Sequence, residues 1–144
     1  MEQLSNVIFY TVDKSIRTYR QYAQRQLKNA GYSITIDQWL VIKTLLENPD
    51  IKQQELGGKI FKDNASVTRI IELLVKAKYL KRKNNTEDRR RAGLEVTEKG
   101  KETIAEVYKI VLRNRSVALD GISKKELETV KKVLMKITKN CQVE

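Results

Sequence analysis

The segment from Asp63 to Arg91 limits the possible folds of this chain more than any other. Its first half has apolar residues at intervals of three and four: Val67, Ile70, Ile71, Leu74 and Val75. This spacing predicts a helix with one buried face. Asp63 stands directly before the helix, where its carboxylate can accept hydrogen bonds from the unpaired N–H groups of the first turn. The segment therefore begins with a capped amphipathic helix.

The opposite face of this predicted helix is polar. It carries Asn64, Ser66, Thr68 and Arg69. In the major groove of DNA, Arg and Asn make bidentate contacts with the edges of purine bases. These four residues are therefore candidate base contacts, although an ordinary surface helix would show the same pattern.

Two basic segments follow the helix and flank a predicted turn at residues 84–87. They are Lys81-Arg82-Lys83 and Asp88-Arg89-Arg90-Arg91. After them, Ala92, Leu94 and Val96 alternate with other residue types, which is the period of a half-buried strand. A helix followed by a basic two-stranded ribbon predicts a winged helix. The helix would enter the major groove, and an Arg at the ribbon tip would reach a phosphate or the minor groove.

The net charge favours the same kind of partner. Lys and Arg total 29 against 18 Asp and Glu, which gives +11. Between Lys59 and Lys101 there are 13 basic and 6 acidic residues, so +7 of this charge lies in 43 residues. Concentrated positive charge favours a polyanionic partner such as DNA. A basic surface that only contacts solvent is the alternative.

The composition argues against catalysis. The sequence has no His, so the commonest general base and the commonest transition-metal ligand are both missing. Gly57-Gly58 lacks the pattern of a phosphate-binding loop, so we interpret it as a close approach between helices. We therefore expect neither an enzyme nor a metal or organic cofactor.

The sequence also predicts a cytoplasmic protein with no membrane partner. Its one Cys, Cys141, cannot form an intrachain disulfide, which fits a reducing compartment. No signal peptide is evident, and no apolar run approaches the roughly 20 residues that span a bilayer.

Helices are predicted on both sides of the central segment. Helical spacing runs from Glu2 to Ala30, and Thr35 with Gln38 forms a capping box for a second helix that Asn48-Pro49 ends. We expect its core side to be Trp39, Leu40, Ile42, Leu45 and Leu46. A third helix from Lys52 to about Ile60 and a tight turn at Phe61-Lys62 complete a helix-turn-helix.

Two more helices are predicted after the ribbon. Thr97 can cap the first, and Ser123 with Glu126 forms a capping box for the second. The first has an apolar stripe of Ile104, Val107, Tyr108, Val111 and Leu112. The second has a stripe of Leu127, Val130, Leu134 and Ile137.

The predicted fold is mainly α, a winged helix-turn-helix with a two-stranded β wing and long terminal helices. Residues 1–33 and 101–144 would be dimerisation segments, and residues 34–100 a DNA-binding domain. The apolar stripes of the terminal helices exceed what the small middle domain can cover, so we expect a homodimer. A monomer whose terminal helices fold back over the middle domain is the alternative.

Five stretches resemble the MarR-type winged-helix regulators of bacteria and archaea. They follow the family's order and spacing over essentially the whole chain: residues 34–39, 54–56, 67–71, 87–90 and 96–100. The resemblance implies a homodimer that binds operator DNA, usually to repress nearby promoters. It also implies that small aromatic ligands bind between the dimerisation helices and the winged domain.

Site residues are carried over from this resemblance by position. Arg90 would be the wing arginine and Asp88 its orienting carboxylate. Asn64, Ser66, Thr68 and Arg69 would face the major groove. With the other basic residues of the turn and the ribbon, the candidate DNA contacts are Lys62, Asn64, Ser66, Thr68, Arg69, Lys81, Arg82, Lys83, Asp88, Arg89, Arg90 and Arg91. The candidate ligand contacts are Tyr19, Trp39 and Tyr108, and core packing explains each of these three equally well.

Three positions depart from the family pattern. Lys78 stands where Gly usually follows the recognition helix, Phe61 fills a turn position that is often Gly, and Gly57 replaces the usual Ala. A left-handed conformation would cost Lys78 about 1 kcal/mol, and we expect the three departures to affect the geometry of the turns more than the function.

The sequence therefore predicts a dimeric, sequence-specific regulator that binds double-stranded DNA at a pseudo-palindromic operator, and we expect it to act as a repressor. A winged-helix module that binds protein instead of DNA is the alternative function. Peroxide-responsive relatives use a Cys in the first helix, which this chain lacks, so we expect Cys141 to be a spectator thiol.

Overall fold

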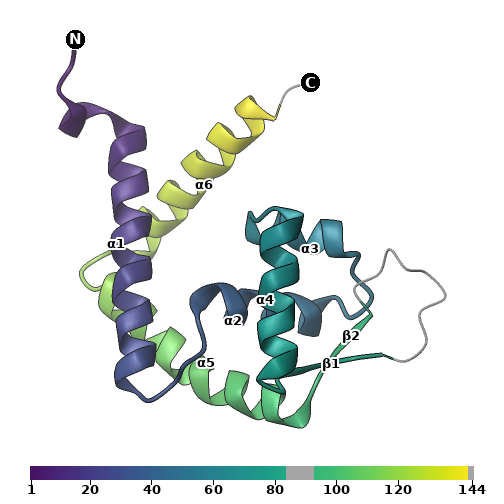
Figure 1. Cartoon of the computed structure of the whole chain (residues 1–144). Coiled ribbons are helices and arrows are strands. Elements are labelled where there is room, and N and C mark those ends of the chain that lie inside the picture. Colours follow the sequence, from purple (N-terminus) through teal and green to yellow (C-terminus); the bar gives the residue numbers. More distant parts are fainter. Residues whose placement is uncertain (84–92, 143–144) are drawn as a thin grey trace. The chain divides into compact units, whose positions relative to one another are not determined.

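The structure is a computed structural model that describes residues 1–83 and 93–142. Within these residues it has the predicted mainly-α fold with a two-stranded antiparallel ribbon (Figure 1). Contacts divide the chain into two compact units, Met1–Asn114 and Arg115–Glu144. The elements are a 3₁₀ turn η1 (Leu4–Asn6), then α1 (Ile8–Asn29), α2 (Ile36–Glu47), α3 (Gln53–Ile60), α4 (Asn64–Lys76), β1 (Leu80–Arg82), β2 (Leu94–Val96), α5 (Glu98–Ala118) and α6 (Lys124–Cys141).

The predicted caps set where the helices begin. In α2, the Gln38 N–H donates to Thr35 Oγ1 at 3.0 Å, and the Thr35 N–H donates to Gln38 Oε1 at 3.0 Å. Ser123 and Glu126 make the same reciprocal pair at the start of α6, at 3.1 Å each. These bonds satisfy N–H groups that a first turn leaves without partners, so both capping boxes are confirmed.

The first helix begins later than predicted. Helical spacing runs from Glu2, but residues 4–6 form a 3₁₀ turn and α1 begins at Ile8. Val7 between them has extended backbone angles and offers no side-chain oxygen to the first turn. The apolar spacing continues through Val7, but the α-helix does not extend across it, because Val7 has no side chain that can cap a helix.

The core of the first unit is built from α2, α3, α4, the ribbon and α5. Its most deeply buried residues include Ile34, Val41, Ile42, Leu56, Val67, Leu74, Leu80, Leu94 and Val107. On α2 the predicted core side is partly wrong, because Leu46 is 39 % exposed while Val41, which the pattern left out, is fully buried.

On α5 the predicted stripe is confirmed for Ile104, Val107 and Val111, but the buried face is rotated away from its other two residues. Tyr108 and Leu112 are 44 % and 46 % exposed, while Ile104, Val107, Ile110 and Asn114 are buried. The cause lies in the first turn, where Gly100 packs so closely on the Tyr79 carbonyl oxygen and on Val96 that a Cβ would overlap both. This contact fixes which side of α5 faces the core.

The two adjacent glycines of α3 differ. A Cβ at Gly57 would lie 2.8 Å from the Lys62 carbonyl oxygen and 3.3 Å from Val67 Cγ2. A Cβ at Gly58 would meet nothing within 4 Å. The predicted close approach is therefore confirmed for Gly57 and wrong for Gly58.

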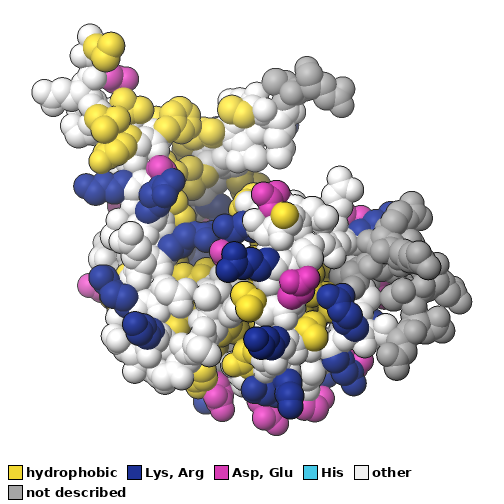
Figure 2. Space-filling model, viewed as in Figure 1, with side chains coloured by type: hydrophobic (Ala, Val, Ile, Leu, Met, Phe, Trp, Pro, Cys, Tyr) yellow, Lys and Arg dark blue, Asp and Glu magenta, His cyan; other side chains and the backbone are white. Residues whose placement is uncertain are grey.

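The terminal segments expose apolar side chains. Leu4, Ile8, Phe9, Val12 and Ile16 are all exposed, and Figure 2 shows apolar side chains (yellow) gathered over the N-terminal segment. In α6 no residue is buried. None of the helices in the described ranges is both long enough and apolar enough to cross a membrane.

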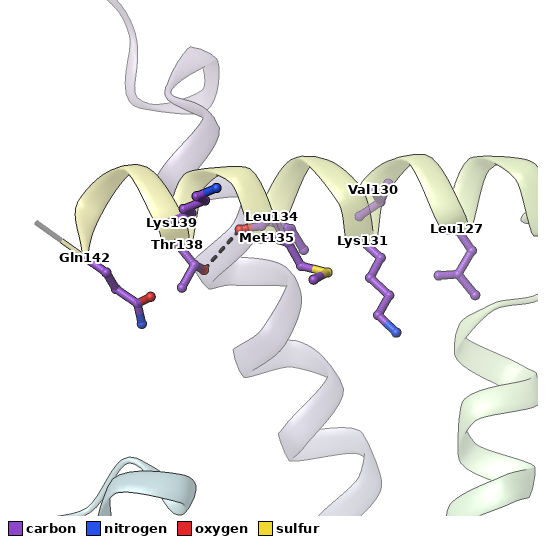
Figure 3. A pocket seen from close by; sticks show the side chains of 8 residues that line it. All are labelled: Leu127, Val130, Lys131, Leu134, Met135, Thr138, Lys139 and Gln142. Carbon is purple, nitrogen blue, oxygen red and sulfur yellow. Dashed lines mark hydrogen bonds between the residues drawn. The ribbon is translucent and has the colours of Figure 1, made fainter.

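One side of α6 forms a shallow groove of about 620 Å³ (Figure 3). Leu127, Val130, Leu134 and Met135 give it an apolar floor, and the Thr138 hydroxyl donates to the Leu134 carbonyl oxygen at 3.0 Å. The predicted stripe of this helix is thus present as an open apolar face.

Candidate nucleic-acid interface

The turn between α3 and α4 keeps the geometry that Phe61 was expected to change. Phe61 has left-handed backbone angles (φ 61°, ψ 41°), and its side chain is 87 % exposed. The Lys62 N–H donates to the Gly57 carbonyl oxygen at 2.9 Å, which closes α3 with the hydrogen bond of a Schellman motif. The absence of glycine has not altered the turn, so that expectation was wrong.

The cap that follows positions α4. Asp63 Oδ1 accepts a hydrogen bond from the Ser66 N–H at 2.7 Å. This bond holds the pKa of the Asp63 carboxyl below its usual value, because the bond favours the charged form. The negative charge also lies at the positive end of the helix dipole. The beginning of α4 is therefore fixed by the chain's own chemistry.

The end of α4 also keeps its left-handed turn, although Lys78 replaces glycine. Lys78 has φ 67°, and the Tyr79 N–H donates to the Leu74 carbonyl oxygen at 3.0 Å. The expected change of geometry is again wrong. Left-handed Lys costs about 1 kcal/mol, and contacts from the start of α5 offset this cost.

Side chains at the start of α5 donate hydrogen bonds to the backbone carbonyl oxygens of the turn that follows α4. The Thr97 hydroxyl donates to the Lys78 oxygen at 2.7 Å and also accepts from the Gly100 N–H at 3.0 Å, so it caps α5 as predicted. The Lys99 ammonium donates to the Ala77 oxygen at 2.9 Å and lies 4.9 Å from the centre of the Tyr79 ring. Thr97, Lys99 and Gly100 therefore form one clamp on the turn after α4.

The buried face of α4 consists of Val67, Ile71 and Leu74. Of the four candidate base contacts, Asn64 and Arg69 are exposed, and Ser66 and Thr68 are half-buried. Arg69 lies on the outward face. Ala65, Glu72, Leu73 and Lys76 are also exposed on α4, and the sequence analysis did not select them.

Asn64 and Thr68 lie together at the edge of α4 that meets α3. The Gln53 side-chain amide donates to Asn64 Oδ1 at 3.0 Å and to Thr68 Oγ1 at 2.8 Å. The sequence analysis missed Gln53. A Gln at the first position of a predicted helix gives little signal, because its partners are 11 and 15 residues away.

Lys62 is paired with an acid of α2. Its ammonium lies 3.4 Å from Asp37 Oδ2, and the Arg20 guanidinium of α1 lies 3.5 Å from Asp37 Oδ1. All three side chains are about one-third exposed or more, so each pair contributes little stability. The Asp37 carboxylate is nevertheless paired with Lys62, which is one of the candidate DNA-binding residues.

The ribbon places three more candidate cations at the surface. Its register pairs Leu80 with Val96 and Arg82 with Leu94, and all of these except Arg82 are buried. Lys81, Arg82 and Lys83 are exposed, and Lys81 Nζ lies 3.6 Å from Glu95 Oε2 on the opposite strand. Asp88, Arg89, Arg90 and Arg91, together with the predicted turn and Ala92, lie outside the described residues.

The three candidate ligand contacts have different environments. Tyr19 is half-buried, Tyr108 is 44 % exposed, and Trp39 is buried with no acceptor for its indole N–H among the described residues. A cavity of about 240 Å³ between α1 and α2 includes none of them. It is lined by Arg20, Gln21, Gln24, Thr35, Ile36 and Asp37.

The described residues do not meet the requirements of a metal site. Within residues 1–83 and 93–142, no group of three or more Cys, Asp or Glu side chains could hold a metal ion. Hydrogen bonds within the protein shift the pKa values of Asp63, Glu126 and Tyr32. The shifts of Asp63 and Glu126 come from helix caps, and the pKa of Tyr32 is raised mainly by its 2.7 Å hydrogen bond to Glu106.

Comparison with known proteins agrees with this geometry. Residues 34–92 match the model of the MarR family. The crystal structure of the transcriptional regulator PA3341 is 25% identical in sequence to this chain, with a TM-score of 0.80. The match covers 93% of this chain and 97% of that one.

Two less similar structures share the fold. One is a mutant of MarR from E. coli complexed with operator DNA, at 19% identity and a TM-score of 0.78, covering 88% of this chain and 90% of that one. The other is the PcaV transcriptional regulator from Streptomyces coelicolor in complex with its natural ligand, at 16% identity and a TM-score of 0.78, covering 96% of each chain.

Proposed function

Because residues 34–92 match the MarR family and the whole chain shares the fold of a transcriptional regulator, we propose that the protein binds a pseudo-palindromic DNA operator as a homodimer and represses transcription there. The observation that carries the proposal is α4. Its buried face and its Asp63 cap hold Asn64 exposed in its first turn and Arg69 exposed within its N-terminal half. The N-terminal residues of a recognition helix are those that reach base edges.

Phosphate contacts would come from the basic ribbon beside α4. Lys81, Arg82 and Lys83 are exposed on β1 and just after it. By the carry-over from the family, Arg90 adds the contact at the wing tip. These side chains position the protein on the duplex, while the α4 side chains read its sequence.

Dimerisation is proposed from the apolar surface of the two terminal segments, residues 1–33 and 101–144. Apolar side chains stay exposed on η1, α1 and α6, and contiguous patches of this kind usually mark an interface. A two-fold dimer would present two α4 helices to half-sites about one helical turn of DNA apart.

A small aromatic effector is the remaining part of the proposal. Binding of a ligand is supported by the similarly folded PcaV protein, whose structure is a complex with its natural ligand, and the aromatic class is what the family resemblance implies. Tyr19, Trp39 and Tyr108 are our candidates for its contacts in this chain. With this function we assign the protein to the cytoplasm and expect no catalytic activity.

The test is selection of bound sequences from a random duplex pool, with and without candidate aromatic acids. We expect two inverted half-sites and an affinity that falls steeply with salt concentration. Arg69→Ala should relax preference at one or two base positions by about 1–3 kcal/mol. Lys76→Ala, at the other end of the same helix, is the matched control and should leave sequence preference unchanged.

A protein that binds every duplex and other polyanions equally would contradict the proposal. That result would favour the second candidate, a winged-helix module that binds protein. The concentration of positive charge at α4 and the ribbon argues against this candidate.

A further inference from the structure

The side-chain amide of Gln53 uses both of its hydrogens within the protein. One hydrogen bonds to Asn64 Oδ1 at 3.0 Å, and the other bonds to Thr68 Oγ1 at 2.8 Å. The Thr68 hydroxyl in turn donates to the Asn64 carbonyl oxygen at 2.9 Å. The hydroxyl has a single hydrogen, so its only donor is already occupied.

These bonds determine the orientation of the Asn64 amide. An amide has an acceptor oxygen at one end and a donor NH₂ group at the other. The oxygen of Asn64 faces the Gln53 donor. Its NH₂ group has no acceptor among the described residues, and the side chain is exposed.

We infer that Gln53 is a specificity-determining positioning residue, which makes Asn64 a hydrogen-bond donor toward DNA. This inference rests on the proposed operator binding. In the major groove, guanine presents O6 and N7 and thymine presents O4, all acceptors, whereas cytosine presents only its exocyclic amine and adenine presents an amine beside its N7 acceptor. We therefore expect Asn64 to prefer guanine or thymine, whose keto oxygens accept its donor, over adenine, where an amine stands beside the N7 acceptor, and over cytosine.

Replacing Gln53 with Glu reverses this logic. A carboxylate accepts hydrogen bonds and cannot donate them when ionised. The Asn64 amide would then turn its NH₂ group toward residue 53 and present its oxygen to the groove. The preferred base should change from guanine or thymine to adenine or cytosine, which offer an amine donor.

Gln54 supplies a matched control. It is adjacent to Gln53 in the first turn of α3, it is exposed, and it makes no side-chain hydrogen bond to another described residue. Gln54→Glu therefore adds the same charge at the same helix end without acting on Asn64. Any general loss of affinity from the negative charge should be shared by the two variants.

The experiment is sequence selection with the full-length wild-type protein and with Asn64→Ala, Gln53→Glu, Gln53→Ala and Gln54→Glu. Asn64→Ala identifies the base position, where preference should relax by about tenfold. Gln53→Glu should invert the preference there, Gln53→Ala should weaken it, and Gln54→Glu should leave it unchanged. If Gln53→Glu does not fold, as judged by thermal melting, Gln53→Ala still provides the test.

Three results would overturn the inference while leaving operator binding intact. They are a wild-type preference for adenine or cytosine at this position, no change of preference in Asn64→Ala, or identical preferences in the Gln53 and Gln54 variants. A wild-type protein that selects no sequence at all would instead reject the proposed function, and the inference with it.

Discussion

Helices α4 and α6 both carry an apolar stripe along one face, but the chain buries only the first. Val67 and Leu74 of α4 are fully buried, whereas Leu127 and Leu134 of α6 are about 40 % exposed. Both helices begin with a side-chain cap that accepts an N–H at the third position. Local sequence therefore accounts for the formation of both helices, and they differ in whether the chain buries the apolar face.

In our proposal, this difference allows one chain to position a DNA-recognition helix and to use a second subunit for its remaining apolar surface. The core holds α4 from behind, so its outward side chains have defined places before any DNA binds. The apolar face of α6 has no such support within its own unit, and in our proposal a second subunit covers it. The predictions below test this contrast, from the largest expected effect to the smallest.

Truncating a buried residue of α4 should have the largest effect. Leu74→Ala removes a fully buried side chain, and we expect it to lower the free energy of unfolding by about 2–5 kcal/mol. Its neighbour Leu73 is 46 % exposed, so Leu73→Ala should change stability by no more than about 0.5 kcal/mol. Urea denaturation measures both, and equal losses would show that the buried face was assigned wrongly.

A charge on the apolar face of α6 should act on assembly instead of folding. Leu134→Asp should weaken the homodimer by at least about 2 kcal/mol, which is roughly 30-fold in Kd, because a carboxylate would be desolvated in the interface. Sedimentation over a range of protein concentrations measures this. Lys136→Asp places the same residue on the opposite face of the helix and is the control. A Leu134→Asp protein that stays dimeric would exclude this face from the interface.

The adjacent glycines of α3 provide a smaller test of packing. Gly58→Ala should stabilise the protein by about 1 kcal/mol, because the helix gains propensity and the new methyl group meets open space. Gly57→Ala should lose this gain and cost about 1–3 kcal/mol, because its Cβ would press on the Lys62 carbonyl oxygen. If thermal melting finds the two variants equal, α3 does not approach the turn as closely as the structure describes.

The features that the sequence predicted correctly are local. The capping boxes at Thr35 and Ser123 join residues three positions apart, so a short window contains both partners. The rotation of α5 depends on the contact of Gly100 with Tyr79, which is distant in sequence, and periodicity cannot detect it. The periodic pattern therefore selected Tyr108 and Leu112 in place of Ile110 and Asn114.

The same distinction applies to the candidate interface. Asn64 and Arg69 followed from the helical pattern alone. The Gln53 amide that orients Asn64 could not be inferred, because the helix-turn-helix fold must form before these residues meet. The turn geometry at Lys78 was predicted wrongly because its left-handed conformation is supported by Thr97 and Lys99. These residues follow the ribbon in the sequence, so a short window around Lys78 does not contain them.

The smallest expected effect concerns the cap of α4. The hydrogen bond from Ser66 lowers the pKa of Asp63 below its usual value of 3.8. The folded state therefore binds this proton less readily than the unfolded state. The resulting stability is present above pH 3.8 and is lost as the pH falls through the lowered pKa of the folded state.

Asp63→Asn isolates this effect, because Asn still accepts the cap hydrogen bond but does not titrate. The difference in unfolding free energy between wild type and Asp63→Asn should be constant from pH 7 down to about pH 5 and should shrink below that. Urea denaturation at each pH measures the difference. Glu126→Gln supplies the comparison in α6, where the Ser123 N–H lowers the carboxyl pKa in the same way. A difference that instead changes between pH 5 and 7 would mean that another group controls the stability of the α4 cap.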